Sequence, residues 1–199
     1  ANRYDVKNIQ LLAGGTHMFA GGWVTPPTVQ QAAWVSHFES DDTVFEAERP
    51  GETPIVLDRA TLDARYLSDE SKFVLDRLAI HGPKVSGELS AESASGPAGP
   101  TLKLKMNIGV SDLTDILRLW PSFINAEVRS WCIAHIHGGQ LQSGSLAIDW
   151  DGPTFYAALH KKGAPPESVH GEFATHGVAI DLLPGVPPLT GLDATGVIT

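Results

Sequence analysis

The chain has 199 residues, with 14 Lys and Arg against 23 Asp and Glu and a formal net charge of −9. An acidic surface repels phosphate backbones, so this balance argues against nucleic acid as a partner. No apolar run approaches the ~18 residues that a membrane-spanning helix needs, so we expect no transmembrane helix in this sequence.

Glycine and proline punctuate the whole sequence, with 20 and 14 copies, and favour many short strands joined by turns. Gly14-Gly15 and Gly21-Gly22 are interpreted as turn glycines. The first strand patterns cover 34–39, 43–47, 54–57, 60–66, 73–81 and 84–91, and the clearest pattern follows at 101–108. The short turns between these segments predict an antiparallel meander.

The period changes to helical between residues 111 and 137. Apolar residues recur at helical spacing over 113–120, and Ser111 or Asp112 is placed to cap the first turn. A second apolar stripe follows, which we interpret as the other helix of a helical hairpin that caps a sheet. Arg129 is expected to tie this hairpin to the sheet through a carboxylate or through strand carbonyls.

Strand patterns return at 140–150, 154–160, 169–175 and 177–182. The fold class that follows is mainly β: an extended, twisted antiparallel sheet, open and groove-like, with one helical hairpin. We expect residues 1–199 to form one β-rich segment of a larger protein, with strands in 1–110, the hairpin in 111–137 and strands again in 138–199.

Catalytic chemistry has no anchored candidate in the sequence. His135-Ile-His137 has the spacing that lets two imidazoles share a metal on a strand, as in cupins, where a Glu follows. Here Gly138-Gly139 follows a helical pattern, so we favour imidazoles that meet the last carbonyls of a helix. Nucleophile and phosphate-loop motifs are absent from the sequence, and the single Cys132 is expected to be a buried small hydrophobe. We therefore expect no enzyme, no metal and no cofactor.

Two segments resemble a known protein family. The first contains Leu117-Arg-Leu-Trp-Pro121, Ala126-Glu-Val-Arg-Ser-Trp131 and His135-Ile-His-Gly-Gly139, and the second is Leu183-Pro-Gly-Val-Pro-Pro-Leu189 followed by 191–199. Together they are similar to AsmA-like proteins, specifically to the YhdP-like branch of bacterial envelope proteins. The positions that carry the resemblance are Trp120, Pro121, Arg129, Trp131, Gly138, Gly139, Pro184, Gly185, Pro187 and Pro188. Residues 1–100 match only in the rhythm of their strands.

The resemblance implies a large protein anchored in the inner membrane, with a long periplasmic β-rich body that moves phospholipid toward the outer membrane. This chain would be a periplasmic segment of that body, with a role in lipid transport and outer-membrane biogenesis. Its implied partners are phospholipid acyl chains and the flanking segments of the same protein.

The residues themselves are compatible with a lipid-binding surface. Leu102, Leu104, Met106 and Ile108 project to one side of their strand, and neighbouring strands would extend this apolar strip. Acyl chains could lie on it, because each CH₂ removed from water contributes about 0.8 kcal/mol. Two alternatives stay open. The same face could pack against a second sheet or the hairpin, and the chain could be a structural or protein-interaction module of the envelope that binds no lipid.

Overall fold

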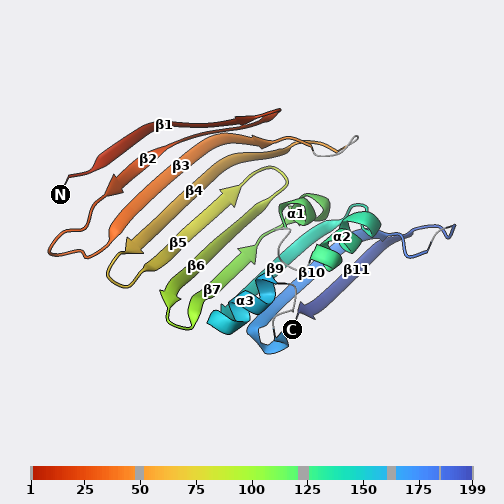
Figure 1. Cartoon of the computed structure of the whole chain (residues 1–199). Coiled ribbons are helices and arrows are strands. Elements are labelled where there is room, and N and C mark those ends of the chain that lie inside the picture. The colour runs from red at the N-terminus through yellow and green to blue at the C-terminus, as the bar shows by residue number, and fades with distance from the viewer. Residues whose placement is uncertain (1, 48–51, 121–125, 161–164, 184, 199) are drawn as a thin grey trace.

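One antiparallel sheet of 11 strands, open at both edges, dominates the protein. The computed structural model describes residues 2–47, 52–120, 126–160, 165–183 and 185–198. Strands β1 to β7, then β9, β10 and β11, lie side by side in chain order, and the two-residue β8 pairs with β9 (Figure 1). The expected mainly β class and the open antiparallel sheet are therefore confirmed.

The strands are β1 (Tyr4–Ala13), β2 (Thr16–Thr25), β3 (Trp34–Phe45), β4 (Ile55–Leu67), β5 (Lys72–His81), β6 (Ser86–Gly96), β7 (Gly99–Ile108), β8 (Ser111–Asp112), β9 (Gln140–Trp150), β10 (Val169–Ile180) and β11 (Leu189–Ile198). The helices are α1 (Leu113–Leu119), α2 (Ala126–His135) and α3 (Gly152–Leu159), with a short 3-10 turn at Pro166–Ser168.

The first hairpin, β1 and β2, falls where the sequence predicts no strand. A register shift between Val6 and Ile9 breaks the alternation of β1, which hides the strand pattern. Gly14 is a turn glycine, as expected, with φ +61°. Gly22 is not: it lies inside β2, where a Cβ would stand 2.0 Å from the carbonyl oxygen of His37. A close approach between β2 and β3 therefore explains this glycine.

Three strands are longer than their sequence patterns. The structure joins 34–39 with 43–47, 54–57 with 60–66, and 169–175 with 177–182 into β3, β4 and β10. In β3 the predicted turn is a local irregularity at Asp42, whose φ of 66° is left-handed. Its effect is to return Thr43 to the face that carries Ser40, because the two hydroxyl oxygens lie 2.8 Å apart.

The strand expected over 154–160 is wrong, because most of this segment belongs to helix α3 (Gly152–Leu159). The Asp151 side chain accepts a hydrogen bond from the Thr154 N–H at 2.9 Å, and Pro153 occupies the first helical turn. Both are helix-start signals, but Asp-Gly-Pro also reads as a turn. Gly152 allows the helix to begin against the β6–β7 turn, since a Cβ there would lie 2.1 Å from the Ala98 carbonyl oxygen.

Two small cores fix α1 and α2 to one side of the sheet. The first contains the buried side chains of Leu113 and Leu117 of α1 with Leu141 and Val178 of the sheet. In the second, Ile116 and Leu119 pack on the buried residues Ile55, Leu57 and Val85. Helix α1 thus bridges the β9–β10 region and the far ends of β3 and β4.

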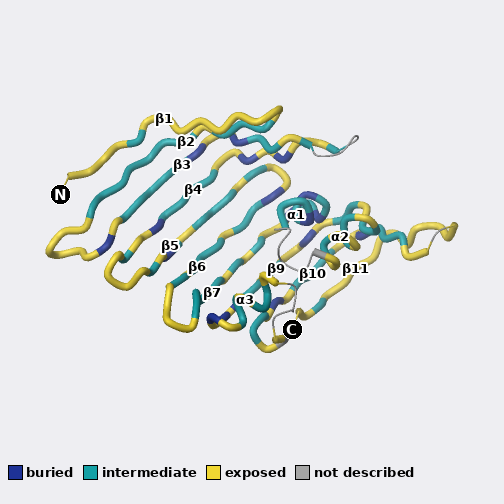
Figure 2. The backbone as a smooth tube through the Cα atoms, in the orientation of Figure 1, coloured by how far each residue is buried: buried dark blue, intermediate teal, exposed yellow. Residues whose placement is uncertain are grey.

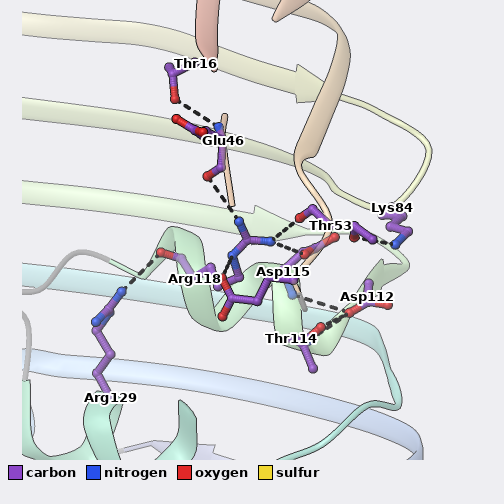
Figure 3. Close-up of polar contacts among 10 residues, drawn as sticks. Thr16, Glu46, Thr53, Lys84, Asp112, Thr114, Asp115, Arg118 and Arg129 are labelled. Atoms are coloured by element: carbon purple, nitrogen blue, oxygen red, sulfur yellow. Dashed lines mark hydrogen bonds and ion pairs between the residues drawn. The ribbon is translucent and has the colours of Figure 1, made fainter. Parts of the chain in front are cut away.

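Arg118 fastens α1 to the connection between β3 and β4 (Figure 3). Its guanidinium donates to the Thr53 carbonyl at 2.7 Å and to the Asp115 carboxylate at 3.1 Å, and it lies 3.6 Å from the Glu52 carboxylate. Arg129 of α2 in turn donates to the carbonyls of Trp120 and Arg118, at 2.7 and 3.3 Å. The expected partner of Arg129 was therefore wrong: it bonds the carbonyl end of α1, not the sheet.

Candidate functional site

The two faces of the sheet differ sharply in chemistry. Residues that are direct partners on neighbouring antiparallel strands point to the same face, so the register assigns every strand residue to one side. We call the side that carries Leu102, Leu104, Met106 and Ile108 the apolar face, and the other side the polar face. The helix-covered cores lie on the apolar face, since Ile108 packs against the first core.

The apolar face runs through the ten strands β1 to β7 and β9 to β11. Leu102 is paired with Trp150, Leu104 with Ala91 and Ile148, and Met106 with Leu89 and Leu146. The same register continues to both edge strands. One complete row across the strands is Val6, Gly22, Phe38, Leu62, Leu78, Leu89, Met106, Leu146, Gly171 and Ile198. The strip that 101–108 predicts is thus one part of a sheet-wide apolar surface.

Three hydroxyl groups on the apolar face, those of Ser36, Ser40 and Thr43, are bonded to the protein. Ser36 donates to the Ala64 carbonyl at 3.3 Å, and Ser40 donates to the Phe19 carbonyl at 2.7 Å. Thr43 is within 2.8 Å of the Ser40 hydroxyl. Because these hydroxyls have partners inside the sheet, they leave the face apolar toward a ligand.

The polar face carries a ladder of ion pairs between neighbouring strands. The pairs are His37–Asp63, Glu39–Arg59, Arg65–Asp76, Lys72–Glu92, Arg77–Glu88 and Lys103–Asp149. The Lys72 ammonium bonds the Glu92 carboxylate at 2.7 Å, which raises the pKa of the lysine and lowers the pKa of the carboxyl. This face is therefore suited to water.

A hollow of about 730 Å³ lies on the polar face, over β3 to β7. His37 and Asp63 in its wall bond each other at 2.6 Å, and Arg77 bonds Glu88. Each of these charged side chains is paired with a side chain of opposite charge. These pairs therefore give the hollow no net charge that would attract an ion.

Helices cover only one end of the apolar face. Figure 1 shows α1, α2 and α3 gathered toward β7, β9 and β10, and α1 reaches the ends of β4 and β5 through the second core. No other described helix lies over β1 to β6. Phe38, Leu62, Leu75, Leu78 and Leu89 are accordingly half-buried, with no described layer above them. Figure 2 shows that much of these strands is of intermediate burial.

The two ends of these strands form different rims. The α1 rim is the end that carries Thr43, Ile55, Leu57 and Val85, all buried. At the opposite end, Trp34, Tyr66 and Phe73 are direct partners on β3, β4 and β5. Their exposed fractions are 40%, 43% and 46%. We call this second end the aromatic rim.

The structure separates the two histidines, and only His135 bonds a carbonyl of helix α2, as the favoured interpretation predicts. His135 stacks on Trp131 with ring centroids 4.7 Å apart, and its Nδ1 lies 2.8 Å from the Trp131 carbonyl oxygen. His137 instead pairs with Asp181 at 3.0 Å. Among the described residues, no three His, Cys, Asp or Glu side chains are placed to hold a metal ion. Cys132 is half-buried, and burial raises the pKa of its thiol.

The positions that carry the family resemblance fall into two groups along the chain. Trp120, Arg129 and Trp131 belong to the α1–α2 region, where Trp120 packs on the first core and Trp131 is 45% exposed. Gly138 and Gly139 have φ of +94° and +100° in the link from α2 to β9. The second group is the link from β10 to β11, where Gly185 has φ +80° and Pro187 and Pro188 precede β11. Pro121 and Pro184 lie outside the described residues.

Sequence reasoning missed the aromatic rim. Trp34, Tyr66 and Phe73 come from three separate strands, and only the register of the hairpins brings them together. The signal available was a pair of aromatic residues, Tyr66 and Phe73, one on either side of the turn Ser68–Ser71.

Comparisons with known proteins found no match to this chain. No family model matches the chain, and no curated protein or solved structure is significantly similar to it. No helix in the described part of the chain is long and apolar enough to cross a membrane.

Proposed function

We propose that this chain is a non-enzymatic periplasmic segment of an AsmA-like, inner-membrane-anchored protein, and that its apolar face holds phospholipid acyl chains on their way to the outer membrane. The observation that carries the proposal is the apolar face of β1 to β6, which no described layer covers except α1 at one rim. Each CH₂ that leaves water for such a surface contributes about 0.8 kcal/mol.

The chemistry of both faces supports an acyl-chain ligand. On the apolar face the hydroxyls of Ser36 and Ser40 are bonded internally, so the surface around them offers dispersion and desolvation but few polar contacts. The polar face pairs its charges and stays in water. The net charge of −9 disfavours adhesion to an anionic membrane surface. Together these properties suit a protein that shields single lipids and does not coat a bilayer.

Native mass spectrometry and lipid extraction of the purified chain test this proposal. Leu78→Lys places a charge on the apolar face, whereas Ala79→Lys places the same residue on the polar face of the same strand, opposite Glu88. We expect phospholipid on the wild-type chain and on A79K, and a loss of most of it from L78K. Absence of lipid from all three folded proteins, even after incubation with phospholipid vesicles, would contradict the proposal.

A second candidate is a structural or partner-binding module, because the sheet has two free edges within the described residues. β1 pairs only with β2, and β11 pairs only with β10. An exposed strand edge can accept another strand through its backbone groups. Gln10→Pro and Leu11→Pro separate this function from lipid binding, because proline removes a backbone N–H. Alternate N–H groups of β1 point to opposite sides, so one of the two variants removes an N–H at the open edge and the other removes one that faces β2. Loss of self-association in one variant, without lipid on the wild type, would favour this candidate.

A further inference from the structure

The two rims of the apolar face are closed to different degrees, which gives the face a direction. At the α1 rim, Ile116 and Leu119 cover Ile55, Leu57 and Val85. Arg118 holds α1 there through the Thr53 carbonyl. At the aromatic rim of β3 to β5, the rings of the aromatic residues remain 40–46% exposed. A ligand that rests on this face therefore meets a wall at one end and an opening at the other.

The aromatic rim has the composition of a boundary between hydrocarbon and water. Trp and Tyr combine an apolar ring with one polar group, and in membranes they concentrate at the level of the lipid headgroups. Trp34 and Tyr66 are direct partners here, and Phe73 extends the row. Directly beyond them is the exposed polar turn Ser68–Ser71. At this rim the strands thus end in amphipathic rings followed by a polar turn.

The row that contains Trp34, Tyr66 and Phe73 becomes buried where a helix covers it. It continues through Ser93 and Leu102 to Trp150, which is only 6% exposed and packs against Phe155 of α3 at a ring distance of 6.4 Å. Under α3 the aromatic ring serves the protein core. Over β3 to β5, the equivalent rings have no such cover within the described residues.

The distance between the rims fits one acyl chain. Ala60, paired with Ser40 and Ile80, marks the last row before the α1 rim, and Tyr66 marks the aromatic rim. Six residues of a strand span about 20 Å at ~3.3 Å per residue. One leaflet of a bilayer, half of the ~30 Å hydrocarbon core, is about 15 Å thick. A chain laid along β3 and β4 therefore ends just short of α1.

We propose that the aromatic rim is the headgroup end of the lipid site: a phospholipid lies along the strands with its ester groups beside Trp34, Tyr66 and Phe73 and its methyl ends toward α1. This inference rests on the proposed lipid-binding function and adds the orientation of the ligand.

Fluorescence quenching by brominated lipid tests the orientation. Wild-type chain and W34F are loaded from phosphatidylcholine vesicles whose lipid is brominated close to the ester end or close to the methyl end, and then repurified. Subtracting the fluorescence of W34F from that of the wild-type chain gives the emission of Trp34. We expect ester-end bromine to remove most of this emission and methyl-end bromine to leave most of it.

A second tryptophan, placed at the α1 rim, should show the opposite order of quenching. In the W34F background, Phe45→Trp places an indole beside the second core, where methyl-end bromine is expected to quench more. Equal quenching at both sites, or the reverse order, would overturn the orientation while lipid binding stands. If no phospholipid is recovered with the wild-type chain, the proposed function itself fails.

Removal of the three aromatic rings of the rim tests independently whether the rim binds the lipid. W34A/Y66A/F73A is expected to lose most of the retained phosphatidylcholine with little change in melting temperature, because all three rings are partly exposed. The matched control truncates three exposed apolar residues away from the apolar face, Leu12, Val29 and Val197, and is expected to retain lipid. Equal retention by both triple variants would overturn the headgroup role of the rim.

Discussion

The β1–β6 half and the β7–β11 half of the sheet share one apolar face but complete it differently. In the second half, α1, α2 and α3 supply the layer that buries Leu141, Ile148, Trp150 and Val178 to 3–8% exposure. In the first half, away from α1, the same alternation leaves Phe38, Leu62, Leu75, Leu78 and Leu89 half-buried. Alternation in a strand therefore specifies which side is apolar, and a separate element has to decide whether that side is covered.

The largest effect should come from removing a side chain in the covered half. Leu117→Ala empties part of the first core, where Leu117 is 5% exposed, and is expected to cost about 2–5 kcal/mol. Leu62→Ala in the uncovered half is the matched control and should cost about 1 kcal/mol, because its surroundings are open on one side. Urea denaturation measures both. Equal losses would show that a further layer covers the first half.

Arg118→Ala should rank next, because it disconnects α1 from the uncovered half. The side chain is 11% exposed and its loss leaves the buried Asp115 carboxylate without its cation, for which we expect about 3 kcal/mol. Arg59→Ala removes a similarly paired arginine from the polar face, where the side chain is 58% exposed, and should cost under about 1 kcal/mol. A small effect of R118A in thermal melts would show that α1 does not depend on this link.

Substitutions of the two tryptophans of the helical region should have the next largest effects on stability, and the two effects should differ. Trp120→Ala removes a ring that packs on the first core and is expected to cost about 3 kcal/mol. Trp131→Ala removes a 45% exposed ring stacked on His135, worth about 1 kcal/mol. Chemical denaturation that found the larger loss for W131A would contradict the placement of α2.

The smallest effect is a pH dependence at Asp115. Burial, then the neighbouring Asp112, raises the pKa of Asp115 above 3.8. The folded state therefore binds this proton more readily than the unfolded state, and the cost of the buried charge is relieved as pH falls through the raised pKa toward 3.8. The unfolding free energy of wild type relative to D115N should rise on acidification over that range. A difference that stays constant with pH would contradict the raised pKa.

The sequence predicts the class of sheet because its central strands alternate cleanly, and it predicts the α1–α2 region because Asp112 and the spacing of Leu113 and Leu117 carry helical signals. It does not predict β1, since the register shift after Val6 breaks the pattern locally. It also misses α3, whose aromatic residues Phe155 and Tyr156 favour strand and whose cap, Asp151, resembles a turn residue. The lipid interpretation remains a proposal that the apolar face supports.

The aromatic rim and the partner of Arg129 lay beyond sequence reasoning for a common reason. Each depends on which residues stand opposite one another across hairpins or helices, and this register is a property of pairing, not of local pattern. Apolar positions could be assigned to a face strand by strand, but Trp34, Tyr66 and Phe73 become a row only when β3, β4 and β5 are aligned.

Three of the arginine hydrogen bonds at α1 end on main-chain carbonyls, and this affects how the protein can change over generations. Arg118 reaches the carbonyl of Thr53, and Arg129 reaches those of Trp120 and Arg118. A carbonyl is present whatever side chain stands at the position, so the acceptor residues can vary without loss of the bond. Selection on these joints therefore falls on single arginines, and residue 53 is free to drift as far as this joint is concerned.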